Sequence, residues 1–315
     1  MRRILVTGAL GQIGSELVPL LRTRFGDECV VASDVRHPEA PATGPFERVD
    51  CMEMQDIERA VQRHDVGTVY HLAALLSVVA KQRPSAAWDL NMGGLYHVLE
   101  VARERGCAVF FPSSIGAFGP STPAQGTPQE TIQRPTTIYG ITKVSGELLC
   151  DYYHRRFAVD TRGLRLPGLI SYAAPPGGGT TDYAVEMFFH ALKQGHYSCY
   201  LRPDTCLDMM YMPDALRAMV ELMAADGAGL VHRNAYNLTA MHFTPERLAE
   251  EIRVHLPDFR VDYRVDPERQ EIADSWPNWM DDSAARAEWG WCPGYDLAAT
   301  TRDMLERLDA RFRSA

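Results

Sequence analysis

Short runs of apolar and β-branched residues alternate with longer segments of helical spacing along the first half of the chain. The short runs are typical of buried parallel strands and predict strands at residues 3–7, 30–33, 46–49, 68–72, 108–112 and 158–166. The longer segments carry apolar residues three and four positions apart and predict helices at residues 13–25, 57–63, 86–105 and 139–155. This alternation predicts an α/β fold, in which helices cover both faces of a doubly wound parallel sheet.

The alternation breaks down near Pro175, where two prolines are followed by three glycines. Beyond this point the helical segments are shorter, and four of the five tryptophans occur there. We therefore expect a dinucleotide-binding domain over residues 1–174 and a smaller, mainly substrate-binding α/β lobe over residues 175–315, with the chain free to cross between them. The lobe is expected to close over the carboxyl edge of the sheet, where such sheets bind ligands.

Composition narrows the class of protein. With 46% hydrophobic and 23% charged residues the chain is typical of a globular protein, and its net charge of −9 gives no reason to expect nucleic acid or an acidic membrane surface as partner. No apolar run approaches the roughly 20 residues of a transmembrane helix. The seven cysteines are scattered without a CxxC pair, which argues against a disulfide framework and a zinc site. We expect a cytoplasmic protein without a metal.

A glycine-rich segment, Gly8-Ala9-Leu10-Gly11-Gln12-Ile13-Gly14, follows the first predicted strand and opens the first predicted helix. Glycines there allow a tight turn and let backbone N–H groups approach a pyrophosphate at the helix N-terminus. Asp34 ends the second strand about 20 residues later, the spacing of a carboxylate that binds an adenosine ribose diol and repels a 2′-phosphate. The pattern predicts NAD as cofactor, although Asp34 also suits a turn or a helix cap. Asp50, after the third strand, is placed either to meet the adenine amino group or to cap a helix.

Tyr139 and Lys143 are four residues apart in a predicted helix, so that the phenol and the ammonium point into one space. A nearby cation favours phenolate over phenol, which brings the tyrosine toward use as a general base. Ser113 and Ser114 end the fifth predicted strand at the carboxyl edge of the sheet, where a hydroxyl can hold the oxygen being oxidised. Loop capping is the alternative for these serines.

Together these features resemble the extended short-chain dehydrogenase/reductases, with the glycine turn, Asp34, His71-Leu72-Ala73-Ala74, Asn91, Ser114 and the Tyr139–Lys143 pair carrying the resemblance. It implies a Rossmann fold that binds NAD(P), with Tyr139 as base, Lys143 as ribose anchor and Ser114 as hydroxyl positioner. Asn91 supports a water-mediated proton path by the same resemblance, or is an ordinary polar helix residue. The resemblance also places these residues at the cofactor: Gln12, Ile13, Leu72, Ala73, Ala74 and Leu166.

Two later stretches of the sequence narrow the choice of substrate class. Sugar-nucleotide members of the superfamily usually carry an asparagine after the sixth strand, and it is absent from Arg165-Leu166-Pro167-Gly168-Leu169-Ile170-Ser171. Instead, the stretches from Pro175 to Ala184 and from Ala273 to Pro277 are similar to those of short-chain L-threonine 3-dehydrogenases. This resemblance implies oxidation of the L-threonine 3-hydroxyl to 2-amino-3-oxobutanoate with NAD. A nucleotide-sugar epimerase or dehydratase and an NAD-binding relative without turnover are the alternatives.

L-Threonine as substrate requires hydrogen-bond donors for its carboxylate. We expect Gly179, Thr180 and Thr181 to form that anion site as the segment from Gly177 to Thr181 orders around the carboxylate, although the threonines also suit helix caps. Ser77, in the loop after the fourth strand, is expected to add a hydroxyl, or else is an ordinary loop residue. Trp276 is expected to wall the pocket, or else belongs to the core of the smaller lobe.

The helices expected from Ala86 to Arg105 and from Tyr139 to Arg155 carry apolar residues on more than one face. A helix with a wide apolar surface needs a second partner besides its own sheet. Family resemblance implies that these two helices pair with their symmetry mates in a C2 homodimer. The apolar residues concerned are Leu95, Val98 and Leu99 on the first helix and Val144, Leu148 and Leu149 on the second.

Overall fold

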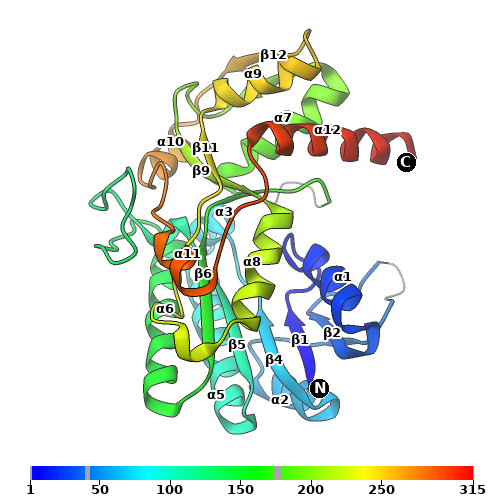
Figure 1. Cartoon of the computed structure of the whole chain (residues 1–315), viewed down its shortest axis with the longest axis vertical. Coiled ribbons are helices and arrows are strands. Elements are labelled where there is room, and N and C mark those ends of the chain that lie inside the picture. The colour runs from blue at the N-terminus through cyan, green and yellow to red at the C-terminus, as the bar shows by residue number, and fades with distance from the viewer. Residues whose placement is uncertain (1, 40–42, 174–178, 315) are drawn as a thin grey trace.

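A seven-stranded parallel sheet forms the centre of the larger lobe (Figure 1). The computed structural model describes residues 2–39, 43–173 and 179–314. The strand order is β10-β6-β5-β4-β1-β2-β3. All strands are parallel, but the chain adds β2 and β3 on one side of β1 and then continues with β4 on the other side, so the order reverses between β1 and β4. The strands are β1 (Arg3–Thr7), β2 (Val30–Asp34), β3 (Phe46–Arg48), β4 (Val66–His71), β5 (Ala108–Ser114), β6 (Thr161–Leu166) and β10 (Tyr236–Asn237). This is the predicted Rossmann fold, and ligands bind such sheets at the carboxyl ends of the strands beside the reversal.

Helices cover both faces of the sheet because alternate strand residues point to opposite sides. Ile4 and Val6 of β1 pack with α1 (Gly14–Phe25) and α8 (Met212–Ala224) in one buried cluster. Leu5, between them, packs in a second cluster on the opposite face. That cluster contains residues of α2 (Met54–His64), α5 (Leu95–Arg105) and α6 (Ile138–Phe157).

The predicted strands of the first half are confirmed, with small shifts at their ends. Strand β6 begins at Thr161 instead of residue 158, because Ala158 has a left-handed φ of 55° and ends α6. The helix predicted over residues 86–105 is interrupted: α4 (Pro84–Trp88) passes through a π-helical turn (Asp89–Gly94) into α5. Ser77 was expected in a loop, but it is the first residue of the short helix α3 (Ser77–Gln82).

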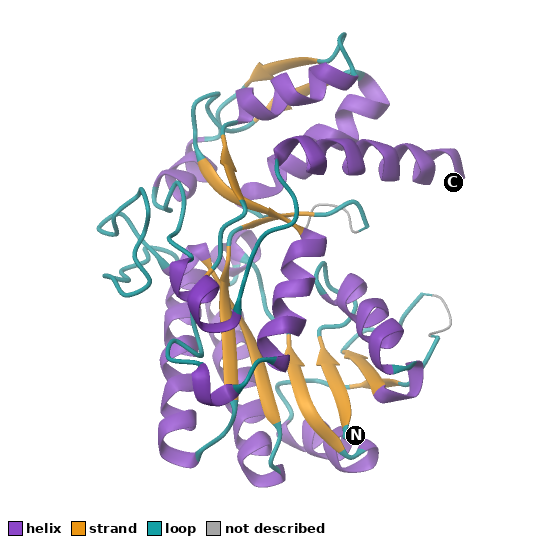
Figure 2. Ribbon diagram, in the orientation of Figure 1, coloured by secondary structure: helices purple, strands orange, loops and turns teal. Residues whose placement is uncertain are grey.

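The smaller lobe lies beyond the carboxyl ends of the sheet strands and has its own core (Figure 2). A three-stranded sheet in the order β11-β9-β7 and a two-stranded sheet of β12 and β8 form its framework. Its strands are β7 (Gly168–Ile170), β8 (His196–Cys199), β9 (Leu207–Tyr211), β11 (Met241–Phe243) and β12 (Arg260–Tyr263). Its helices are α7 (Tyr183–Gln194), α9 (Pro245–His255), α10 (Pro267–Asp274) and α12 (Leu297–Ser314).

The second half of the chain also returns to the large sheet. Helix α8 follows β9 directly and covers one face of the sheet, while β10 adds a seventh strand beside β6. Trp291, which follows α11 (Ser283–Trp289), is buried in the same cluster as Leu17 of α1. Residues after 175 therefore build parts of both cores.

The apolar residues expected at a helix interface differ in exposure: those of α5 are buried, Val144 and Leu149 of α6 are half-buried, and Leu148 is exposed. Leu95, Val98 and Leu99 lie in the core under the sheet, so α5 presents other side chains outward. Leu148 of α6 is 62% exposed, as its place on the outer face predicts. Over the described residues, no helix combines the length and apolar character needed to cross a membrane.

Candidate active site

A tight glycine turn joins the end of β1 to the start of α1. Gly8 has a φ of +67°, and a Cβ atom there would lie 2.7 Å from the backbone nitrogen of Ala73. A Cβ atom on Gly14 would lie 2.4 Å from the carbonyl oxygen of Gly8. Both positions therefore require glycine. The turn brings the N-terminus of α1 to the carboxyl edge of the sheet, where the helix dipole favours an anionic group such as a pyrophosphate.

A cavity of about 260 Å³ lies beside this turn, between the ends of β1, β2 and β4. Its position at the reversal of strand order is the one expected for the adenosine half of a dinucleotide. The structure brings together here six of the predicted cofactor residues, namely Gly8, Gly11, Asp34, Leu72, Ala73 and Ala74.

Asp34 is almost buried and already has protein partners. Its carboxylate accepts hydrogen bonds from the backbone N–H groups of Leu10, at 3.2 Å, and Arg36, at 3.1 Å. The Arg36 guanidinium forms an ion pair with it, with Nε 3.1 Å from Oδ1. Asp34 therefore organises the turn and also lines the cavity, so the two interpretations of this residue are compatible.

Asp50 and Asn91 have other contacts, and neither lines this cavity or the adjoining one that contains Tyr139. The Asp50 carboxylate accepts a hydrogen bond from the Met52 backbone at 2.9 Å, in the turn before α2. Asn91, in the π-helical turn, accepts from the backbone N–H of Leu75 at 2.8 Å and donates to its carbonyl at 3.1 Å. It also donates to the Thr142 hydroxyl at 3.2 Å. Asn91 thus holds the segment after β4 against α6.

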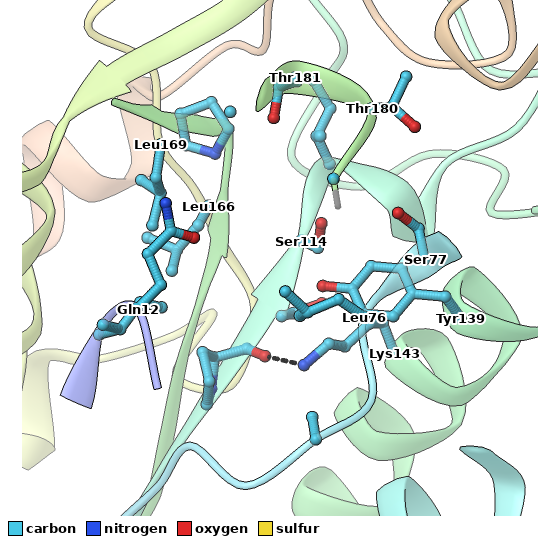
Figure 3. Close-up of a pocket in the computed structure, with 18 of the residues that line it drawn as sticks. Gln12, Leu76, Ser77, Ser114, Tyr139, Lys143, Leu166, Leu169, Thr180 and Thr181 are labelled. Atoms are coloured by element: carbon cyan, nitrogen blue, oxygen red, sulfur yellow. Dashed lines mark hydrogen bonds between the residues drawn. The ribbon is translucent and has the colours of Figure 1, made fainter. Parts of the chain in front are cut away.

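A second cavity, of about 140 Å³, adjoins the first and contains the predicted catalytic residues (Figure 3). It is closed below by the ends of β5 and α6 and above by the segment that leads into α7. The predicted residues that line it are Gln12, Ile13, Leu72, Ala74, Ser77, Ser114, Tyr139, Lys143, Leu166, Gly179, Thr180, Thr181 and Trp276.

Tyr139 and Lys143 stand one turn apart at the start of α6. Thr137 caps this helix by accepting a hydrogen bond from the backbone N–H of Gly140 at 3.1 Å. The Lys143 ammonium donates to the carbonyl of Pro112 at 2.6 Å and lies 5.4 Å from the centre of the Tyr139 ring. Because Lys143 is only 5% exposed, its position is fixed by this bond and by packing.

Burial governs the ionisation of both groups. It lowers the pKa of Lys143 to about 8, while the negative charge of Glu147 acts in the opposite direction. Burial also raises the pKa of Tyr139 above its ordinary value, and hydrogen bonding with Ser114 offsets only part of that rise. In the protein by itself, desolvation therefore outweighs the effect expected of the cation, which was to favour phenolate over phenol.

Ser114 faces Tyr139 from the end of β5 (Figure 3). Its hydroxyl oxygen accepts a hydrogen bond from the backbone N–H of Gly116 at 3.1 Å and thereby caps the short turn Ile115–Ala117. A Cβ atom on Gly116 would lie 3.2 Å from the Tyr139 ring and 3.4 Å from the Ser114 hydroxyl. The serine is thus both a cap and a hydroxyl directed at the phenol.

The upper side of the cavity is formed by the turn Thr180–Asp182 before α7. Neither threonine caps this turn; instead the Asp182 carboxylate accepts a hydrogen bond from the backbone N–H of Gly179 at 2.7 Å. Within the part of the chain that the structure describes, the buried Thr180 hydroxyl has no hydrogen-bond partner. Residues 177 and 178, the first part of the segment expected to order around a carboxylate, lie outside the described residues.

Ser77 and Trp276 both reach the cavity. Ser77, at the start of α3, is 7% exposed and lies on the same side as Tyr139 (Figure 3). Trp276 follows α10, is 8% exposed, and belongs to the core of the smaller lobe as well as to the cavity wall. Both interpretations of the tryptophan therefore hold.

Sequence reasoning missed three apolar residues of this wall, Leu76, Ile115 and Leu169. These leucine and isoleucine residues carry no signal of their own, because only the fold brings them beside the catalytic side chains. It also missed Glu147, the buried carboxylate one turn beyond Lys143. A signal was present there, since Tyr139, Lys143 and Glu147 recur every four residues along one helix.

Comparisons with known proteins agree with this geometry. The model of the NAD dependent epimerase/dehydratase family matches residues 4–238. An uncharacterized epimerase/dehydratase of Staphylococcus saprophyticus is 55% identical over 317 residues, covering 100% of this chain and 99% of that protein.

Solved structures are similarly close. The L-threonine dehydrogenase of Clostridium difficile is 54% identical, with a TM-score of 0.97 over 99% of this chain and 98% of that one. A monomeric L-threonine 3-dehydrogenase from a metagenome, in its apo form, is 45% identical, with a TM-score of 0.95 over 98% of this chain and 99% of that one. The expected family resemblance is confirmed. This chain belongs to the NAD-dependent epimerase/dehydratase family and is an oxidoreductase whose cofactor is NAD.

Proposed function

We propose that this protein oxidises the 3-hydroxyl of L-threonine to a ketone, giving 2-amino-3-oxobutanoate. The C3–H bond breaks with both electrons, and the hydroxyl proton is taken by Tyr139. NAD supplies the hydride acceptor at its nicotinamide C4 and becomes NADH. The observation that carries the proposal is the 140 Å³ cavity, in which a phenol and a serine hydroxyl face two threonine hydroxyls.

Tyr139 acts as the general base, and Ser114 holds the substrate oxygen beside it. The two side chains come from α6 and β5 and meet at the cavity floor, with Gly116 leaving room between them. Ser114 and Tyr139 line the same cavity and Ser114 faces the phenol, so a substrate hydroxyl bound at this point lies within reach of both groups. Lys143 lies behind the tyrosine ring, where its charge stabilises the phenolate as it forms and its ammonium binds the cofactor ribose.

The residues present fit a bound dinucleotide. The turn from Gly8 to Gly14 receives the pyrophosphate at the N-terminus of α1, and Asp34 receives the adenosine ribose. Leu72, Ala73 and Ala74 then form the strand end along which the cofactor passes from the larger cavity to the smaller one. Gln12, Ile13 and Leu166 also line the smaller cavity, while Asn91 holds the segment after β4 through Leu75.

The amino acid is held from above. The Thr180 and Thr181 hydroxyls donate to the substrate carboxylate, and the unpartnered Thr180 hydroxyl supports this role. Ser77 supplies a further hydroxyl from α3. Trp276 closes the side of the cavity and excludes water, which protects hydride transfer.

The size of the cavity favours a small substrate over the nucleotide-sugar alternative. Pockets for drug-sized ligands are roughly 300–1,000 Å³. The catalytic cavity, at about 140 Å³, lies below that range, which favours a substrate as small as an amino acid. The two L-threonine dehydrogenases compared above support the same choice.

The direct test is to mix purified protein with NAD and L-threonine and follow absorbance at the NADH band. We expect steady NADH formation, with 2-amino-3-oxobutanoate or its decarboxylation product aminoacetone in the mixture. A nucleotide-sugar epimerase or dehydratase recycles its cofactor, so it predicts no net NADH from any free amino acid. L-Threonine that is recovered unchanged would refute the proposal.

We also propose a C2 homodimer formed through α5 and α6. Apolar side chains are exposed along these helices and the neighbouring α4, at Trp88, Tyr96, Ile141, Leu148 and Tyr152. Large apolar side chains exposed on adjacent helices favour an interaction site there. Light scattering at micromolar protein should give twice the 35.2 kDa chain mass, whereas the monomer mass would exclude the dimer.

The cytoplasmic location stays a prediction from the cysteine pattern.

A further inference from the structure

A buried ion pair lies directly behind the catalytic residues. Glu147 of α6 is 4% exposed and Arg165 of β6 is 6% exposed. The guanidinium contacts both carboxylate oxygens, with Nη2 2.8 Å from Oε2 and Nε 3.1 Å from Oε1. This geometry is bidentate and fixes both side chains.

The carboxylate has two further donors. The Ser113 hydroxyl donates to its Oε1 atom, and the Gln133 amide donates to Oε2 at 3.0 Å. Arg165 in turn donates to the carbonyl of Gln129 at 2.9 Å and to the Asn237 side-chain oxygen at 3.0 Å. Glu147 is therefore the centre of a network that joins α6, β5, β6 and the segment before α6.

The partners of Glu147 are sequence neighbours of the catalytic groups. Ser113 precedes Ser114 and follows Pro112, whose carbonyl accepts the hydrogen bond from Lys143. Arg165 is paired in register with Ser113 across the two strands. One carboxylate thus sets the distance between the strand end that carries the serine and the helix that carries the tyrosine and lysine.

We propose that Glu147 is a positioning residue, whose buried carboxylate locks α6 to the ends of β5 and β6 and so holds Lys143 charged and Ser114 opposite Tyr139. The proposal rests on the dehydrogenase function for its effect on kcat. Such enclosed ion pairs add little net stability in general, so we expect the function of this pair to lie in what it positions.

The electrostatic part of the proposal concerns Lys143. The groups that face its ammonium are Tyr139, Glu147 and Cys150 from α6 and His71 from β4. Burial lowers the Lys143 pKa to about 8, and Glu147 is the largest influence that raises it. Removing that negative charge therefore moves the Lys143 pKa further down. At an effective dielectric constant near 20 and a separation of one helical turn, the expected shift is about one to two pH units.

The chain allows this shift to be observed directly. Lys81, Lys143 and Lys193 are its only lysines, so protein labelled with carbon-13 at the lysine ε position gives three signals. Lys81→Arg and Lys193→Arg assign them. In the wild type we expect the Lys143 signal to titrate at about pH 8. In Glu147→Gln it should titrate near pH 7 or below, and in Glu147→Asp, which keeps the charge, near its wild-type position.

A matched control lies at the opposite end of β6. Arg162 is also nearly buried and forms a bidentate pair with Asp160, but neither residue touches the catalytic cavity within the described chain. Asp160→Asn removes one charge of that pair and should lower thermal stability without moving the Lys143 titration. A Lys143 signal that titrates at the same pH in Glu147→Gln, Asp160→Asn and wild type would overturn the proposal.

Turnover gives the second readout. At pH 8 the kcat of Glu147→Gln should fall about five-fold or more, because most Lys143 is then neutral, while KM for threonine and NAD changes less than about three-fold. An equal loss of kcat in Asp160→Asn would mean a general structural effect and would count against the proposal. If Glu147→Gln does not fold, Ser113→Ala is used instead, because it removes one hydrogen-bond donor to Glu147 and keeps the Glu147–Arg165 ion pair. An unchanged kcat in Ser113→Ala would also overturn the proposal. The lysine titration needs no substrate, so absence of NADH in the wild type would refute only the dehydrogenase function.

Discussion

Two sides of the catalytic cavity differ in how their polar groups are paired. We call the side with Ser114, Tyr139 and Lys143 the floor, and the side with Gly179, Thr180 and Thr181 the roof. On the floor, Lys143 donates to a backbone carbonyl, and the Ser114 hydroxyl accepts a hydrogen bond from the backbone N–H of Gly116. On the roof, within the described residues, the buried hydroxyl of Thr180 has no partner. The side-chain amide nitrogen of Gln12, on the proposed cofactor side, is also buried without a hydrogen-bond partner among the described residues.

An unpaired buried polar group costs about 1–3 kcal/mol, so the two surfaces differ in what they gain from a ligand. The floor is complete before substrate arrives and can determine the rate of the chemical step. Under the proposed function, the Thr180 hydroxyl gains its missing partner when the threonine carboxylate binds. This contrast leads us to expect kcat effects from the floor and KM effects from the roof.

The strongest test of the floor is Tyr139→Phe. The ring still packs beside Gly116 and Lys143, but no group remains to take the hydroxyl proton. We expect kcat to fall by about 10²–10⁴-fold, the usual contribution of a general base, with NAD binding nearly unchanged in calorimetry. A mutant that keeps more than a tenth of the wild-type rate would show that Tyr139 is not the base.

The ionisation of the floor predicts the pH dependence. Because burial raises the pKa of Tyr139, the reactive phenolate is scarce at neutral pH and increases about ten-fold per pH unit. The rate of threonine oxidation should therefore rise about 100-fold between pH 6 and pH 8. Above the Lys143 pKa of about 8 the lysine loses its charge, so the rise should level off. A flat kcat profile from pH 6 to pH 10 would contradict both assignments.

The matching test of the roof is Thr181→Ala, with Thr180→Val as its partner variant. Each change removes one hydroxyl from the proposed carboxylate site, and a hydrogen bond to a charged group is worth about 1.5–3 kcal/mol. KM for threonine should rise roughly 10–150-fold, while kcat and NAD affinity change little. If both variants keep a normal KM, the carboxylate is bound elsewhere and the contrast between floor and roof fails.

The floor could be predicted almost entirely from the sequence. Its strands are buried on both faces and appear as continuous apolar runs, and its catalytic pair is spaced by one turn of a single helix. What the spacing could not reveal was the solvent exposure of Tyr139. The nearby Lys143 cation predicts a lowered pKa for Tyr139, whereas burial raises the pKa of this phenol.

The roof and the sheet edge were harder to predict because they depend on contacts between distant parts of the chain. Strand β10 has only two residues and pairs with β6 about 70 positions earlier, so no periodic signal marks it. Helix α3 has six residues, and Ser77 therefore appeared to lie in a loop. The apolar residues of α5 illustrate the same limit, since the sequence showed that Leu95, Val98 and Leu99 are apolar but not which partner they face.

The smallest expected effect lies outside both surfaces, at the adenosine cavity. Asp34→Ala removes the proposed ribose partner and also frees Arg36, whose Nε atom lies 3.1 Å from the Asp34 carboxylate. NAD binding should weaken about ten-fold, as expected for one lost charge-assisted hydrogen bond, while NADP gains relative to NAD because a free guanidinium can pair with its 2′-phosphate. The double variant with Arg36→Ala should keep the loss for NAD and lose the gain for NADP. Titration calorimetry that gives unchanged NAD affinity in Asp34→Ala would mean that this carboxylate serves only to hold Leu10 and Arg36 in the turn.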